Sequence, residues 1–235
     1  SEGMKKGITD GGCDEKKVFV VPNFSNRELF NPNLSGENFR TKREWLKDSP
    51  LLVYTGTFGM INGVSYLVDI AEQLLNLNSN VKILLLGDGR EFTKVKSYAR
   101  EKNVLDFNLF IEPSINKEEL PEVLAAADLA SNIVISVPEV WNNSANKFFD
   151  ALASGTPVLI NSGGWQAELI EREEIGIVTY GLSLNEAAVK IDQFLHNNTK
   201  LEISSKNAQK VSKSFFDKNN LTNDILDVLL AVKND

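Results

Sequence analysis

Short, uninterrupted apolar runs alternate with longer amphipathic stretches through the middle of this chain. The runs are rich in Val, Ile and Leu, which is typical of strands buried on both faces of a parallel sheet. Parallel strands need crossover connections, and these are right-handed. The pattern predicts a doubly wound, Rossmann-like α/β domain whose ligand binds at the carboxyl ends of its strands. We expect strands at or within residues 17–21, 51–55, 81–86, 108–111, 129–137, 157–161 and 176–179.

Helices are expected between these strands, at 64–77, 90–102, 117–126, from about 144, and at 165–171. The tail from 184 to 235 has no strand pattern and is predicted to form two or three helices. An apolar stripe in this tail consists of Ile225, Val228, Leu229 and Val232. We therefore interpret 13–183 as the Rossmann-like domain, 184–235 as helices packed on it, and 1–12 as the end of a preceding domain with a linker.

Composition narrows the classes of function. The 235 residues are 42% hydrophobic and carry a net charge of −7, so a basic surface for nucleic acid or anionic lipid is not expected. No run approaches the length of a transmembrane helix, and the start lacks the apolar core of a signal peptide. The single cysteine, Cys13, cannot form an internal disulfide, which fits a reducing compartment. We expect a cytoplasmic piece of a longer chain, without a metal site, because no Asp-x-Asp run occurs.

The most informative segment spans 142–157, which follows a strand and opens a helix. Asn142, Asn143 and Ser144 are candidates for the N-cap, and free N–H groups at such a helix start bind anions. Lys147 lies close to that start, where a cation opposes the helix dipole. We predict that it meets a diphosphate; the alternative is a local ion pair with Asp150, three residues further on.

Two other features of the loops bear on a site. Gly56 and Thr57 follow the strand at 51–55, and glycine there lets backbone N–H groups approach a ligand, although a tight turn explains it equally well. Phe148 and Phe149 are predicted to be core residues rather than stacking platforms. Gly155, with Pro157 beyond it, is the expected terminator of the helix.

Several motifs occur in a fixed order: V-V-P-N at 20–23, G-D-G at 87–89, A-S-G-T-P-V at 153–158 and G-G-W-Q-A-E at 163–168. On these motifs the chain, from about Val18 to its end, resembles the carboxyl-terminal domain of retaining glycosyltransferases of family 4. Those enzymes have the GT-B architecture of two facing doubly wound domains. The wording N-K-F-F-D-A-L at 146–152 is most similar to the branch that builds capsular, exopolysaccharide and O-antigen chains, often with amino sugars.

The resemblance implies a donor-binding domain for a nucleotide-diphosphate sugar, with UDP favoured over GDP by the branch. It implies that Asp150 binds the ribose hydroxyls and that the nucleobase lies near Ile111 and Glu112. The family's first acidic position falls on Asn142, and its two basic positions fall on Thr57 and Asn62, so Lys147 would supply the missing charge. The implied donor-binding set is Gly56, Thr57, Ile111, Glu112, Asn142, Asn143, Ser144, Asn146, Lys147 and Asp150.

By the same resemblance, the protein needs neither metal nor cofactor, and Lys147 with the helix N–H groups activates the donor. Its partners would be a glycan or lipid-linked acceptor and an amino-terminal acceptor domain absent from this sequence, so this piece is expected to be inactive alone. The full-length protein would be cytoplasmic, with a peripheral location at the inner face of the membrane.

Three alternatives stay open at this point. One is a GT-B nucleotide-sugar epimerase, which usually needs charged residues in several loops. Another is a non-catalytic nucleotide-sugar-binding module, for which the uncharged residues Thr57, Asn62 and Asn142 would be natural losses. The third is a flavodoxin-like domain.

Overall fold

The computed structural model describes residues 1–234, and of 231–234 only the backbone. Within this range one parallel sheet of six strands has the order β3-β2-β1-β4-β5-β6. Val53 in the central strand β1 pairs with Leu84 of β2 on one side and with Ala130 of β4 on the other. The winding therefore reverses between β1 and β4. The strands are β1 (Leu51–Thr55), β2 (Lys82–Leu86), β3 (Leu109–Glu112), β4 (Leu129–Ser131), β5 (Val158–Ile160) and β6 (Gly176–Val178).

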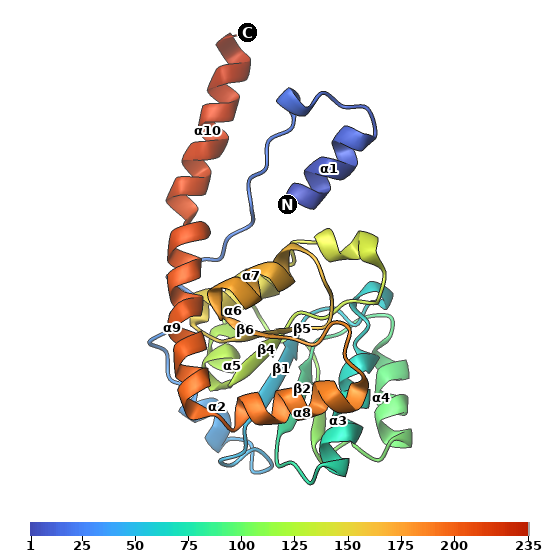
Figure 1. Cartoon of the computed structure of the whole chain (residues 1–235). Coiled ribbons are helices and arrows are strands. Elements are labelled where there is room, and N and C mark those ends of the chain that lie inside the picture. Colours follow the sequence, from blue (N-terminus) through green and yellow to red (C-terminus); the bar gives the residue numbers. More distant parts are fainter. Residues whose placement is uncertain (235) are drawn as a thin grey trace.

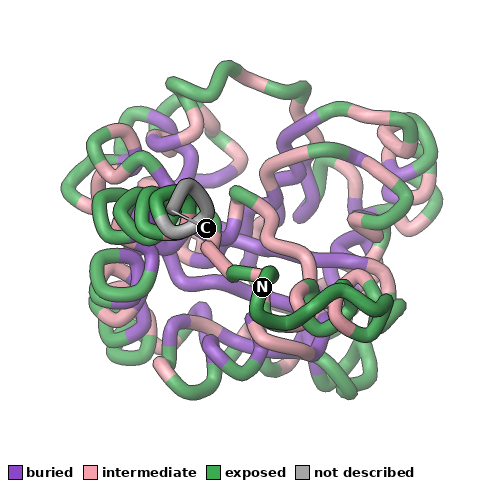
Figure 2. Tube along the Cα trace, turned by 90° about the horizontal axis from the view of Figure 1, so that it is seen from above, coloured by how far each residue is buried: buried purple, intermediate pink, exposed green. Residues whose placement is uncertain are grey.

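Helices cover both faces of the sheet, as predicted for a doubly wound domain (Figure 1). Leu52 and Tyr54 of β1 point to a core shared with α3 (Ser65–Asn76), α4 (Phe92–Glu101) and α8 (Leu184–Leu195). Leu51 and Val53 point to the other core. That second core is closed by α2 (Glu37–Thr41), α5 (Leu120–Ala126), α6 (Asn146–Ser154), α7 (Trp165–Glu173) and α9 (Asn198–Phe215). Figure 2 shows the buried residues gathered between these layers.

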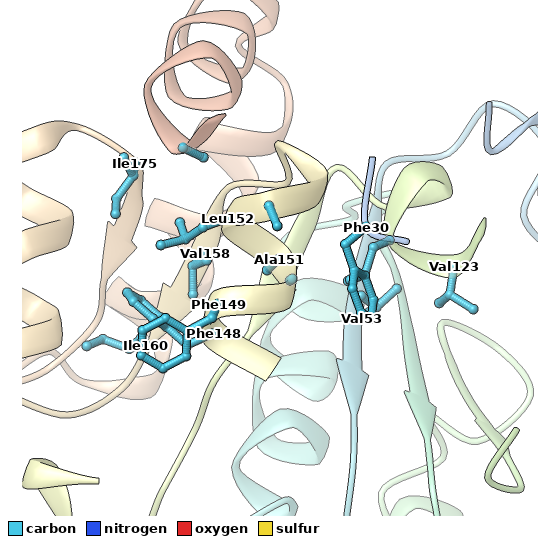
Figure 3. Packing of buried hydrophobic residues seen from close by; sticks show 14 of the residues in the cluster. Phe30, Val53, Val123, Phe148, Phe149, Ala151, Leu152, Val158, Ile160 and Ile175 are labelled. Atoms are coloured by element: carbon cyan, nitrogen blue, oxygen red, sulfur yellow. The ribbon is translucent and has the colours of Figure 1, made fainter. Parts of the chain in front are cut away.

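Helix α6 is anchored by its aromatic pair. Phe148 and Phe149 are 0% and 1% exposed, and they lie beside Val158 and Ile160 of β5 (Figure 3). They are core residues, as predicted. Burying two aromatic side chains stabilises this packing by several kcal/mol, about 2 each. Gly155 ends the helix in the left-handed conformation, with φ of 73°, which confirms its predicted role as terminator.

One strand prediction is wrong. Residues 17–21 form no strand: a short 3-10 helix, Glu15–Lys17, leads into extended chain in which Phe19 is 56% exposed. An apolar run is not a strand without a neighbouring strand to bond, and none of the six described strands pairs with it. The strand expected within 129–137 is confirmed as β4, Leu129–Ser131; beyond it, the backbone of Val134 forms hydrogen bonds with the side chain of Asn161.

The two terminal helices differ from the rest. Helix α1 (Glu2–Asp10) lies against a 3-10 segment, η3 (Pro138–Asn142), which precedes α6. Helix α10 (Lys218–Asn234) extends beyond the body of the domain (Figure 1), where Ile225 and Leu229 are 42% and 61% exposed. The predicted stripe is therefore not packed against the domain at these two positions, and the side chain of Val232 lies outside the described residues. No described helix is both long enough and apolar enough to cross a membrane.

Candidate ligand-binding cleft

A cleft of about 650 Å³ opens at the carboxyl edge of the sheet. It sits where the winding reverses, which is the expected ligand position in an open α/β sheet. Its walls come from the loops after β1, β2 and β3 and from the first turns of α6. The lining residues are Thr55, Gly56, Thr57, Asn62, Leu86, Gly87, Asp88, Ser114, Ile115, Lys117, Leu120, Ala145, Asn146, Lys147 and Asp150.

Glycine is required in two of these loops because of what surrounds them. A Cβ on Gly87 would lie 1.8 Å from the carbonyl oxygen of Gly56, so the loops after β1 and β2 touch through their backbones. Gly56 has φ of 138°, and a Cβ there would lie 3.0 Å from Lys147 Nζ. Gly56 therefore fits both interpretations given to it from the sequence, a tight turn and a ligand site: it adopts the backbone conformation of the turn, and it leaves room for the ammonium group of Lys147 in the cleft.

Lys147 is one of the two lysines among the residues that line the cleft. Its Nζ lies 3.9 Å from the centroid of the Tyr54 ring, which is the geometry of a cation–π contact. None of the ion pairs among the described residues involves Lys147, so the alternative of a local pair with Asp150 is not what the structure shows. Burial lowers the pKa of Lys147 to about 7. An incoming anion would restore the charged form of this side chain and gain its attraction.

The loop beneath Lys147 is held by hydrogen bonds to a single carbonyl. The hydroxyl of Tyr54 donates to the carbonyl oxygen of Thr57 at 2.7 Å, and Asn62 Nδ2 donates to the same oxygen at 2.6 Å. Asn62 thus orders the loop. Neither Thr57 nor Asn62 carries charge, so in this part of the cleft the positive charge comes from Lys147.

The start of α6 differs from the prediction. Its N-cap is Ala145, which offers no side-chain hydrogen bond, so the expectation that an Asn or Ser caps this helix is wrong. The segment that leads into α6 is instead held by Asn23, a residue distant in sequence. Asn23 Nδ2 donates to the carbonyl oxygen of Ser144 at 2.7 Å and to Asn146 Oδ1 at 3.3 Å. The first N–H groups of α6 are therefore left without a side-chain cap beside the cleft, where they favour an anion.

Asp150, one turn further along α6, also lines the cleft and is 9% exposed. Its Oδ1 accepts a hydrogen bond from Ser25 Oγ at 2.5 Å. Burial raises the pKa of Asp150, while the hydrogen bond from Ser25 and the charge of Lys117 act in the opposite direction. Sequence reasoning missed Ser25 and Lys117, since Ser25 lies 125 positions from its partner and no local pattern joins the two.

The structure brings half of the predicted set into this cleft: Gly56, Thr57, Asn146, Lys147 and Asp150. Ile111 and Glu112 do not line it. The carboxylate of Glu112 is held by Arg43, with Nε–Oε1 at 2.9 Å and Nη2–Oε2 at 2.6 Å. A bidentate pair of this kind fixes the carboxylate away from other partners. A nucleobase contact near Ile111 and Glu112 stays a prediction.

The residues before α6 are also outside the lining. Asn142 lies under α1: Ser1 Oγ donates to its carbonyl oxygen at 2.7 Å, and a Cβ on Gly3 would lie 1.9 Å from Asn142 Oδ1. The carbonyl of Asn143 accepts from Trp165 Nε1 at 3.1 Å. Ser144 borders a neighbouring, more apolar hollow. Donor contacts by these three residues stay predictions as well.

Comparison of the sequence with known proteins identifies a family to which this chain is similar. The family of "Glycosyl transferases group 1" matches residues 35–211. An uncharacterised glycosyltransferase of Methanocaldococcus jannaschii is 27% identical over 199 residues, which are 83% of this chain and 49% of that protein. The lipopolysaccharide 1,2-N-acetylglucosaminetransferase of Salmonella typhimurium is 24% identical over 155 residues, 65% of this chain and 40% of that protein. The chain thus spans about half the length of these relatives or less.

A solved structure shares the fold over almost the whole chain. HepE of Anabaena, crystallised in complex with UDP, superposes with a TM-score of 0.84 at 18% identity, over 98% of this chain and 62% of that one. The same protein was also crystallised with UDP-glucose. At this level of identity the likeness establishes the Rossmann-like fold of a GT-B half.

Proposed function

The chain belongs to the glycosyl transferases of group 1, and on that premise we propose that it is the donor-binding part of a retaining, family 4 glycosyltransferase. Its substrate would be a nucleotide-diphosphate sugar, with UDP as the nucleotide. The UDP and UDP-glucose complexes of HepE support this choice of nucleotide. The Salmonella relative supports transfer of a hexosyl or N-acetylhexosaminyl group in surface polysaccharide synthesis.

One observation carries the proposal: the buried ammonium group of Lys147 lies at the start of α6, which has no side-chain cap, in a cleft that is also lined by Gly56 and Gly87. Cleavage of the bond between the anomeric carbon and the diphosphate leaves negative charge on the departing oxygens. Lys147 Nζ and the first N–H groups of α6 are fixed before the reaction, so they stabilise that charge without reorganising. In this proposal the reaction needs no metal, and donor activation falls to Lys147.

Asp150 would take the ribose, because it is the acidic side chain that reaches the cleft from within α6. The acceptor would be a glycan or a lipid-linked sugar, bound by a further domain of the full-length protein. Transfer therefore requires that domain, and this chain alone binds the donor without turning it over. We place the full-length protein in the cytoplasm, with a peripheral location at the inner face of the membrane.

The test is calorimetric titration of the chain with UDP, GDP and ADP. We expect UDP to bind most tightly and Lys147→Met to weaken it by about tenfold or more, as for the loss of a charge-assisted contact. Lys82→Met is the matched control, because Lys82 is also partly buried but lies at the start of β2, on the opposite edge of the sheet. Equal UDP affinity for wild type and Lys147→Met would remove Lys147 from the site.

A non-catalytic nucleotide-sugar-binding module is the second candidate, and Asn142 favours it. At the position of the family's first Glu the chain has an amide, and α1 covers it. Full-length protein with UDP-sugars and a lipid-linked acceptor separates the two. Donor binding without transfer or hydrolysis would identify the module, and transfer would identify the enzyme.

A further inference from the structure

The amine of Lys147 is buried without a hydrogen-bond acceptor. It joins no ion pair among the described residues. Its Nζ lies instead 3.9 Å from the centroid of the Tyr54 ring, with the backbone of Gly56 on another side. A buried ammonium without an acceptor is costly, so this environment favours the neutral amine and its free lone pair. The lysine side chains that do donate hydrogen bonds within the described part of the chain are Lys6, Lys82, Lys94, Lys102 and Lys190.

The first turn of α6 offers an anion site beside that amine. The N–H groups of Asn146 and Lys147 have no acceptor among the residues that the structure describes, because Ala145 caps the helix without a side-chain bond. All three residues line the cleft of about 650 Å³. Free N–H groups at a helix start bind phosphate. The cleft therefore combines a phosphate site with an unpaired amine.

Three further charged side chains line the cleft: Asp88 from the loop after β2, Lys117 from the loop after β3, and Asp150 from α6. Neither carboxylate pairs with Lys147, and burial is what lowers the pKa of Lys147 to about 7. Tyr54 beneath the amine stays protonated, because burial raises its pKa. About half of the Lys147 side chains are therefore neutral at pH 7, where an ordinary lysine is almost wholly protonated.

We propose that the cleft is a modification site, at which Lys147 forms a reversible imine with a phosphorylated aldehyde whose phosphate lies on the free N–H groups of α6. The lone pair of Nζ attacks the aldehyde carbon, both amine protons pass to the carbonyl oxygen, and that oxygen leaves as water. The products are one C=N bond and one water, so the step needs no oxidant or reductant. The imine occupies the cleft and excludes other ligands until it is hydrolysed. The inference goes beyond the proposed function, because it needs only the amine and the helix start.

The test treats the whole chain with pyridoxal phosphate. Borohydride converts the imine to a stable secondary amine, and mass spectrometry of the digested chain identifies the modified lysine. We expect Lys147 to react at least about tenfold faster than any other lysine side chain. Pyridoxal, the same aldehyde without its phosphate, should react with Lys147 about tenfold more slowly, because it lacks the charge-assisted contact. Equal rates for the two aldehydes would show that no phosphate site guides the reaction, and the inference would fail.

The pH dependence separates this amine from one at the surface. The second-order rate constant follows the neutral fraction of the unoccupied protein, so at Lys147 it should rise by no more than about twofold from pH 7 to 8. At an exposed lysine the rate constant rises about tenfold over the same interval. A tenfold rise at Lys147 would identify an ordinary amine and would overturn the inference.

Variants supply the matched controls. Lys147→Met and Lys147→Arg have no primary amine at this position and should lose the fast reaction. Lys82→Met should react like the wild type: burial also lowers the pKa of Lys82, but its amine donates to the carbonyl oxygen of Phe107 at the start of β2, away from the cleft. Mapping of the wild type identifies the modified residue even where a variant does not fold.

Two outcomes separate this inference from the proposed function. Modification of Lys82 or of surface lysines as fast as that of Lys147 would overturn the inference, and UDP binding measured by calorimetry could still support the proposed function. Selective modification of Lys147 in a chain that binds no UDP would support the inference while the proposed function fails.

Discussion

The depressed pKa of Lys147 makes nucleotide binding depend on pH with a predictable sign. Burial holds this pKa at about 7 in the unbound protein. A diphosphate beside the ammonium favours the charged form and raises the pKa, so binding draws a proton from solution. Affinity should therefore fall as the pH rises above 7.

The magnitude follows from the titration curve. With a pKa of about 7, roughly half of the Lys147 side chains are protonated at pH 7 and about a tenth at pH 8. If the bound lysine stays protonated throughout, the affinity for UDP falls about fivefold over that interval. The uptake is about 0.5 proton per nucleotide at pH 7 and about 0.9 at pH 8. Phosphate groups with a second pKa of about 6 are already ionised in this window, so they contribute little.

The assay is calorimetry of UDP binding from pH 7 to 8.5 in buffers of differing ionisation enthalpy, which counts the protons taken up. Lys147→Met should bind weakly with no slope and no uptake. Lys147→Arg, which keeps its charge throughout this range, should also lose both the slope and the uptake. If wild-type protein binds UDP with an affinity independent of pH and no proton uptake, the nucleotide does not meet this ammonium group, and the reasoning is refuted.

Three further variants test the fold around the cleft. The lowered pKa of Lys147 means that the unfolded chain binds more protons than the folded protein between pH about 7 and 10.5, so the free energy of unfolding of the wild type should rise with pH across that window. In urea unfolding, Lys147→Met should show a flatter pH dependence and, at pH 7, should be more stable by up to about 4 kcal/mol. Arg43→Ala should cost about 1–3 kcal/mol, because it leaves Glu112 partly buried without its bidentate partner; the double variant with Glu112→Ala should recover part of that loss. Gly87→Ala should cost at least about 3 kcal/mol in thermal unfolding, since its Cβ would collide with a carbonyl oxygen at 1.8 Å, whereas Gly7→Ala, with open space around it, should cost nothing.

The sheet could be predicted because its strands are buried on both faces. Residues 51–55 and 81–86 read as unbroken apolar runs, and the structure buries nearly all of them. The same rule failed for 17–21, whose apolar residues lie in extended chain outside the sheet. Apolar character reports burial or partial burial, but strand formation also needs hydrogen-bond partners, which the local sequence does not reveal.

The cleft was predictable where its residues are close in sequence and opaque where they are not. Lys147 and Asp150 follow from their place near the start of one helix. The partner that engages Asp150 comes from residue 25, and the partner that withdraws Glu112 comes from residue 43. Both contacts depend on how loops distant in sequence fold over the sheet. A count of the polar residues at the strand ends therefore overestimates the number of side chains that face the ligand.

The hydrogen bonds from Asn23 give the first turn of α6 an external anchor. This amide belongs to the chain that runs from α1 toward the sheet, and it grips residues 144 and 146 at once. A shift of this extended segment is therefore transmitted directly to the first turn of α6, beside Lys147. The alignment of the positive end of α6 is thus governed by a peptide segment that itself contributes no wall to the cleft.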